Sequence, residues 1–154
     1  MSKQLLEHVY REASRGNSQP LLDALADDVR WTIIGSTELS GVYRGKREVT
    51  GSLLARLRAR LATPVTFTFE RFIADGEYVV MQARGQATAI TGLAYDNTYC
   101  IVARIVDGQI REMTDYVDTE LITRALFGSG LLGGALAVED GTDEPGIGGP
   151  TQSQ

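Results

Sequence analysis

The chain has 154 residues, enough for one domain with a substantial core and too few for two comfortable ones. Hydrophobic residues make up 43% of it and charged residues 23%, as in soluble proteins, and no apolar run approaches the roughly 18 residues of a membrane span. The net charge of −5 and the lack of a basic face argue against nucleic acid as a partner. Because the N-terminal segment lacks the apolar core of a signal peptide, we expect a cytoplasmic protein that does not bind membranes.

Two helices are predicted at the start of the chain. Leu5, Val9 and Ala13 recur every four residues, which indicates a helix over about 2–15. A short helix containing LLDALA follows, and two aspartates end it. Both helices offer an apolar face that must be buried against other elements.

The next segment predicts one strand and the longest helix. Val29, Trp31 and Ile33 alternate with polar residues, which is typical of a half-buried strand. A loop, STELSGVYRG, leads to a helix predicted over about 46–62. The apolar stripe of that helix consists of Val49, Leu53, Leu57 and Leu61.

The second half of the chain predicts four strands and a last helix. Asp-Gly pairs at 75–76 and 107–108 are strong signals for two-residue hairpins. A helix over about 119–127 begins at the capping residue Asp118 and stops at Gly128. The strands are predicted at about 65–73, 77–90, 97–106 and 109–117.

This order of elements predicts an α+β domain over residues 1–128. We expect a curved antiparallel sheet wrapped around the N-terminal helices, cone-shaped, with one apolar pocket for a small ligand. The outer sheet face alternates polar and apolar residues, which favours a homodimer through that face. The segment 129–154 is glycine-rich and acidic, and we expect it to be partly disordered or docked as a lid or at an interface.

Several segments, in order, resemble the SnoaL-like polyketide cyclase group: LLDALADDVRWTIIG, GVYRGKREV, GLAYDNTYC and VDGQIREMTDYVDTELI. That group is part of a superfamily that also contains nuclear transport factor 2, ketosteroid isomerase and limonene epoxide hydrolase. The resemblance covers about residues 3–127 and implies the fold. This fold hosts many functions, and some members are not enzymes.

The resemblance to ketosteroid isomerase does not extend to its catalytic residues. Its carboxylate base corresponds to Ile33, and its two oxyanion-binding groups correspond to Val9 and Ile101, with Tyr10 one position away. Three apolar residues in place of three polar ones disfavour steroid-type isomerisation by that set of residues.

The epoxide hydrolase site is matched only in part. Asp115 corresponds to the aspartate of its final strand and Arg84 to its arginine. Gln86 stands where its second aspartate belongs, and Trp31 and Ile33 replace the residues that position its water. A related hydration or ring-closing reaction that uses Asp115 stays open.

Asp115 and Arg84 are the candidate catalytic residues. Asp115 shares its strand face with Met113 and Val117, and such apolar neighbours raise the pKa of a carboxyl group towards the range of general acid–base catalysis. Arg84 could orient Asp115 or bind a ligand oxygen if it faces the pocket, and it is a surface or interface residue if it faces outward. The alternative for Asp115 is a structural aspartate that binds a backbone amide or an arginine.

The chain predicts a small-molecule site without a metal or organic cofactor, because metal-ligand clusters and phosphate-binding glycine loops are absent from the sequence. We therefore expect a cyclase, isomerase or hydratase/hydrolase that acts by general acid–base chemistry on an apolar, oxygen-bearing substrate. A binding protein without catalysis and an oligomeric interaction protein are the alternatives. The residues expected to bind the substrate are Trp31, Ile33, Tyr43, Leu57, Asn97, Tyr99 and Met113.

Overall fold

The structure is a computed structural model that describes residues 2–128; the predicted C-terminal segment lies outside the described residues. The helices are α1 (Ser2–Ser14), α2 (Gln19–Ala24), α3 (Lys46–Glu48), α4 (Ala55–Ala59) and α5 (Thr119–Leu121), with π-helical turns η1 (Val49–Leu54) and η2 (Ile122–Leu126). The strands are β1 (Leu25–Ile33), β2 (Gly41–Arg44), β3 (Thr66–Asp75), β4 (Tyr78–Gln86), β5 (Thr98–Val106) and β6 (Gln109–Val117).

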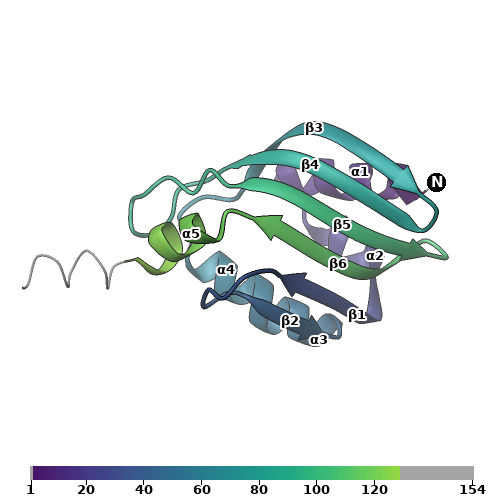
Figure 1. Cartoon of the computed structure of the whole chain (residues 1–154), viewed down its shortest axis with the longest axis horizontal. Helices are drawn as coiled ribbons and strands as arrows, with labels where there is room; N and C mark the ends of the chain where they lie inside the picture. Colours follow the sequence, from purple (N-terminus) through teal and green to yellow (C-terminus); the bar gives the residue numbers. More distant parts are fainter. Residues whose placement is uncertain (1, 129–154) are drawn as a thin grey trace, which may run out of the picture.

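The strands form one open, curved sheet in the order β2-β1-β6-β5-β4-β3. Figure 1 shows α1, α2 and the α3–α4 helix together behind this sheet, so the helices cover one face only. The predicted α+β class is confirmed. One pairing differs from the expected antiparallel pattern, because β1 runs parallel to β6. Parallel neighbours need a long connection, and residues 34–108 lie between these two strands.

The helix α1 buries Leu6, Val9 and Tyr10. The predicted stripe placed Leu5 and Ala13 beside Val9, but both are only half-buried. Tyr10 instead enters the core, where its ring meets that of Phe67 edge-on at 5.6 Å between centroids. The apolar face of α1 is therefore turned slightly from the predicted one, towards the aromatic residue.

The longest predicted helix is confirmed, and it runs without interruption from α3 through η1 to α4. Val49 and Leu53 are fully buried in its first half, whereas Leu57 and Leu61 are half-buried. The helix ends at Ala59, three residues before the predicted end. Leu57 and Leu61 thus line a cavity instead of filling the core.

One strand and one helix end in the first half of the chain were predicted wrongly. The segment treated as a loop contains β2, which pairs with β1 so that Trp31 lies opposite Tyr43. Three of the four β2 residues are exposed, so the strand carries no detectable alternation. The helix α2 ends at Ala24, and Leu25 already belongs to β1, because it pairs with Ile110 of β6.

The four later strands and their hairpins are confirmed. Val106 pairs with Gln109, which leaves Asp107-Gly108 as a two-residue turn, as predicted. Asp75 pairs with Tyr78, so the first turn is Gly76-Glu77, one residue later than predicted. Asp107 and Gly108 both have positive φ, 52° and 72°, as a hairpin turn of this length requires. The strand β4 ends at Gln86, four residues earlier than predicted.

The last helix begins at Asp118 as predicted. The carboxylate of Asp118 accepts a hydrogen bond from the backbone N–H of Leu121 at 3.1 Å, so it caps the helix. Thr119–Leu121 and the π-helical turn that follows bury Ile122, Ala125 and Leu126 at the end of the sheet. This cap fixes the chain direction directly after β6, the strand that carries Asp115.

Candidate functional site

A cavity of about 570 Å³ lies between the helices and the inner face of the sheet. Cavities of this size and mainly apolar lining are typical of small-molecule sites. Its inner end is formed by buried residues from α1, β1, β5 and β6: Tyr10, Trp31, Tyr99, Ile101 and Asp115. Its rim is formed by exposed residues that follow α1 and by the end of the α3–α4 helix.

Asp115 is the buried carboxylate of this cavity, and the residue is 8% exposed. The indole Nε1 of Trp31 donates a hydrogen bond to Oδ1 of Asp115 at 2.9 Å. The register explains this contact, because Asp115 lies beside Ile33 and Trp31 beside Met113 on the neighbouring strands. Alternate residues share a sheet face, so both side chains point to the helical side.

The second carboxylate oxygen of Asp115 is open to the cavity. Within residues 2–128, no residue donates a hydrogen bond to Oδ2, and no fully buried side-chain oxygen lacks a partner. Oδ2 is therefore not sealed in the core. A carboxylate held at one oxygen and free at the other is oriented for contact with a bound molecule.

Burial raises the pKa of Asp115 from 3.8 to about 7, and the Trp31 hydrogen bond opposes part of this rise. Removal from water disfavours the charged carboxylate, whereas an N–H donor favours it. The group can therefore exchange a proton near neutral pH. Efficient general acid–base catalysis requires a pKa in that range.

Two phenols lie near this carboxylate. Burial raises the pKa of Tyr10 and of Tyr99 well above the ordinary value. The negative charge of Asp115 adds to the rise at Tyr10, and Tyr95 followed by Asp115 add to it at Tyr99. Both phenols therefore stay protonated and can act as hydrogen-bond donors. Tyr99 also lies beside Tyr95, whose own pKa is raised mainly by burial.

Four of the predicted site residues line the cavity: Trp31, Leu57, Tyr99 and Asp115. Ile33 lines a smaller adjoining hollow of about 40 Å³, which shares those four residues with the cavity. That these residues contact a ligand stays a prediction.

Tyr43 and Met113 do not line the cavity, contrary to expectation. The Tyr43 phenol donates to the backbone oxygen of Leu39 at 2.7 Å and lies within 3.4 Å of a guanidinium nitrogen of Arg56. Met113 is fully buried in the hydrophobic core. Both side chains are on the helical side of the sheet, but neighbouring side chains already fill the space around them.

Asn97 does not line the cavity, and its side chain bonds to other parts of the protein. Its Oδ1 accepts hydrogen bonds from the backbone N–H groups of Thr98 at 2.8 Å and Asp118 at 2.9 Å. Its Nδ2 donates to the Tyr95 hydroxyl and to the Asp118 carbonyl oxygen, each at 3.2 Å. Asn97 thus connects the start of β5, the strand that carries Tyr99, to the end of β6, the strand that carries Asp115.

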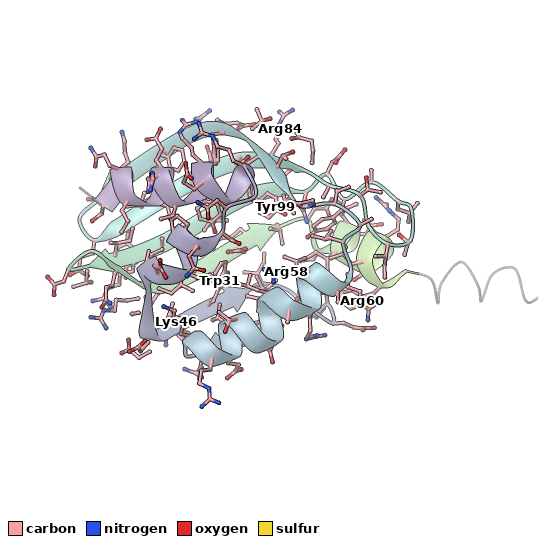
Figure 2. All side chains as sticks on the ribbon, turned by 180° about the vertical axis from the view of Figure 1, so that it is seen from behind. Trp31, Lys46, Arg58, Arg60, Arg84 and Tyr99 are labelled. Carbon is pink, nitrogen blue, oxygen red and sulfur yellow. The ribbon has the colours of Figure 1, made fainter. Side chains whose placement is uncertain are left out.

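Arg84 faces away from the cavity, so the prediction that it assists Asp115 is wrong. Its Nε bonds to the Glu70 carboxylate at 2.9 Å, and its side chain is 70% exposed. Figure 2 shows it on the outer side of the sheet. Its strand alternates, with Ala83 buried and Arg84 exposed, so the outward alternative for this arginine is the correct one.

Tyr10 and Arg58 are cavity residues that the sequence analysis did not assign to the site. Tyr10 stands next to the position matched to an oxyanion-binding tyrosine, so an alignment shifted by one residue would have found it. Arg58 lies beside the apolar stripe of its helix, where a solvated side chain is the ordinary expectation.

A second, more polar depression of about 550 Å³ adjoins the rim and shares Gly16, Thr63 and Pro64 with the cavity. Its two charged lining residues, Arg15 and Asp96, are both exposed. Neither side chain is removed from water, whereas Asp115 is buried, so we place the candidate site at Asp115.

Within residues 2–128, no cluster of three or more acidic, histidine or cysteine side chains is arranged to hold a metal ion. Over the same range, none of the helices combines the length and hydrophobicity needed to span a bilayer.

Solved structures with the same fold include several NTF2-like proteins. One from Burkholderia pseudomallei, of unknown function, is 26% identical, with a TM-score of 0.73 over 81% of this chain and 96% of that one. A provisionally assigned SnoaL-like polyketide cyclase from Jannaschia is 15% identical, with a TM-score of 0.69 over 83% of this chain and 92% of that one. A provisionally assigned isomerase from Rhodopseudomonas palustris is also 15% identical, with a TM-score of 0.66 and coverages of 83% and 97%.

Residues 6–113 match the SnoaL-like domain family. The chain therefore belongs to this family, within the NTF2-like superfamily whose fold it shares. No functionally curated protein matches the chain significantly in sequence. The fold relatives named above are too distant in sequence to carry a specific activity over.

Proposed function

We propose that this protein is an enzyme that moves a proton on a small, largely apolar, oxygen-bearing molecule, with Asp115 as the general base and acid. The reaction would be an isomerisation, a cyclisation or a hydration, and no cofactor takes part in the proposed chemistry. The observation that carries the proposal is a buried carboxylate with a pKa of about 7 and one oxygen open to an apolar cavity.

Each group around Asp115 has a role in this proposal. Trp31 holds Oδ1 and leaves Oδ2 to take a proton from a carbon atom or a water molecule. Tyr10 and Tyr99 keep their protons at neutral pH and can donate to an oxygen that gains negative charge. The apolar walls exclude water, which strengthens both interactions.

A generic proton-transfer substrate tests the proposal without knowledge of the natural one. In 5-nitrobenzisoxazole a base removes the proton on C3, the C–H electron pair forms a nitrile, and the N–O bond breaks to release a coloured phenolate. We expect this elimination to be catalysed, with a rate that rises with pH and levels off above about pH 7. Asp115→Asn should lower the rate by about 100-fold or more, because it removes the base.

The matched control is Asp75→Asn, which neutralises an exposed carboxylate at the end of β3. It should leave the elimination rate unchanged. A rate that survives Asp115→Asn, or that never exceeds that of acetate at equal concentration, would contradict the proposal.

The alternative function is binding without catalysis. The observation in its favour is the mainly apolar lining of the cavity, which could hold an apolar ligand without any use of Asp115. In that case ligand would raise the melting temperature of the wild type and of Asp115→Asn equally, and neither would turn over 5-nitrobenzisoxazole.

A further inference from the structure

The charges of the cavity are separated along its depth. Among its lining residues only Asp115 and Arg58 are charged. Asp115 is buried at the inner end, whereas Arg58 is exposed at the rim. Leu54 and Leu57, from the same helix as Arg58, form part of the apolar wall between the two ends. The cavity thus has an acidic inner end, apolar walls and a basic rim.

Arg58 differs from the two neighbouring arginines of its helix, which are engaged with other segments of the chain. Arg56 donates to the backbone oxygen of Glu38 at 2.6 Å. Arg60 donates to the backbone oxygen of Leu126 at 3.2 Å and stacks over the Phe127 ring at 4.3 Å. These two arginines hold the helix in place.

The Arg58 guanidinium forms no hydrogen bond or ion pair with any of the residues 2–128, and it borders the cavity. Figure 2 shows Arg58 on the side of the helix that faces Trp31, whereas Arg60 lies at the far end of the helix. A guanidinium carries a permanent charge and a planar set of donors that matches carboxylate and similar oxyanions.

The inner end of the cavity is unsuitable for an anion. Above neutral pH the Asp115 carboxylate would repel a second negative charge, and the surrounding apolar side chains would leave that charge without solvation. A molecule with one anionic end would therefore enter with its apolar part first. Its charge would then remain at the rim, where water and Arg58 can both reach it.

We propose that the substrate is an amphipathic organic anion whose carboxylate or similar acidic oxygen group is bound by Arg58 at the cavity rim, while its apolar part reaches Asp115. This inference rests on the proposed function for the chemistry at Asp115, but the recognition by Arg58 can be measured separately. It deepens that function by assigning the substrate a charge and a direction of entry.

Two fluorescent probes that differ only in a sulfonate test the inference: 1-anilinonaphthalene-8-sulfonate and the neutral N-phenyl-1-naphthylamine. Their dissociation constants are measured for the full-length wild type and for Arg58→Gln. We expect Arg58→Gln to weaken the sulfonate probe about tenfold and the neutral probe less than twofold, because only the former is charged. Arg58→Lys should retain part of the preference, and salt should weaken only the sulfonate probe.

The matched control is Arg47→Gln, which removes an exposed arginine from α3, in the same continuous helix but away from the cavity lining. It should change neither dissociation constant. A second control, Ala13→Trp, fills the cavity from α1 and should weaken both probes, which shows that they bind there.

The inference would be overturned if Arg58→Gln weakened both probes equally, or if Arg58→Gln and Arg47→Gln had equal effects. It would also be overturned if Ala13→Trp did not weaken binding of the probes, because they would then bind outside the cavity. These outcomes are independent of the elimination assay. Loss of catalysis in that assay with the probe preference intact would remove the proposed function and leave an anion-selective binding site.

Discussion

At the scale of single residues, the acid–base property of Asp115 has a thermodynamic consequence. Its pKa is about 7 in the folded protein and 3.8 in the reference state without burial. Between about pH 4 and pH 7 the unfolded chain is ionised at this position while the folded protein holds the proton. Folding then takes up a proton, so stability falls as the pH rises and becomes constant above about pH 7.

We predict that Asp115→Asn stabilises the protein at pH 8. Asparagine is nearly isosteric, its oxygen can still accept from Trp31, and it carries no charge to bury. The pKa difference corresponds to on the order of 4 kcal/mol at most, and the advantage should shrink steadily below pH 7 and vanish near pH 4. Urea unfolding across this pH range measures it. A variant less stable than the wild type at pH 8, or an advantage independent of pH, would be inconsistent with a desolvated Asp115.

The Trp31 indole should act as a positioning group that also lowers the pKa of Asp115. Trp31→Phe removes the N–H donor to Oδ1, so the pKa of Asp115 should rise and the pH–rate curve for 5-nitrobenzisoxazole should move to higher pH. Tyr43→Phe is the control, because that phenol bonds to the backbone of Leu39 outside the cavity. An unchanged midpoint in Trp31→Phe would show that the indole only packs.

At the scale of elements, β4 and β5 approach closely where Tyr99 enters the cavity wall. A Cβ atom at Gly85 would stand 2.7 Å from Cε2 of the Tyr99 ring and 3.0 Å from a methyl group of Val65. Only glycine allows the ring to lie where it does. A Cβ atom at Gly51, in η1, would meet no atom within 4 Å.

We therefore predict opposite effects for two glycine-to-alanine variants. Gly85→Ala should destabilise the protein by about 1–3 kcal/mol and displace Tyr99, which also weakens binding of N-phenyl-1-naphthylamine. Gly51→Ala should stabilise it by up to about 1 kcal/mol, because alanine favours the helix and nothing obstructs its methyl group. Thermal unfolding of both variants checks the pair; equal effects would mean that the contact with Tyr99 does not constrain Gly85.

The elements also show what the sequence could predict. The two hairpins and the long helix follow from strong local patterns and are confirmed, although the first turn is one residue later than predicted and Leu61 lies beyond the end of the helix. The strand β2 was missed because it has four residues and only Tyr43 is buried. Leu25 was assigned to a helix because LLDALA fits a helical period, while its pairing with Ile110 depends on a strand more than 80 residues away.

Prediction of the site was limited in the same way, because local patterns do not show which distant residues meet in the fold. The face of Asp115 followed from strand alternation, and so did the wall position of Trp31. Arg84 was placed by a family correspondence, whereas its own strand already alternates between buried and exposed residues. Arg58 could not be assigned from the sequence, because a solvated helix arginine and a rim arginine carry the same local pattern.

At the scale of the whole molecule, the homodimer through the outer sheet face stays a prediction. Tyr78 and Tyr116 are each 48% exposed there, beside ion pairs such as Arg104 with Glu77. We predict a dimer in sedimentation equilibrium at micromolar concentrations, and a shift to monomer in Tyr116→Glu, because a buried unpaired charge is costly. A wild-type monomer would remove the interface, and an unchanged dimer in the variant would place it elsewhere.

Proton binding by the buried Asp115 carboxylate can be measured without a substrate. A ¹³C NMR titration follows the Asp115 carboxyl carbon of the full-length protein, assigned by its disappearance in Asp115→Asn. We predict a midpoint near pH 7. A midpoint near pH 4 would show that Asp115 is a solvated or paired carboxylate and would contradict its role in proton transfer.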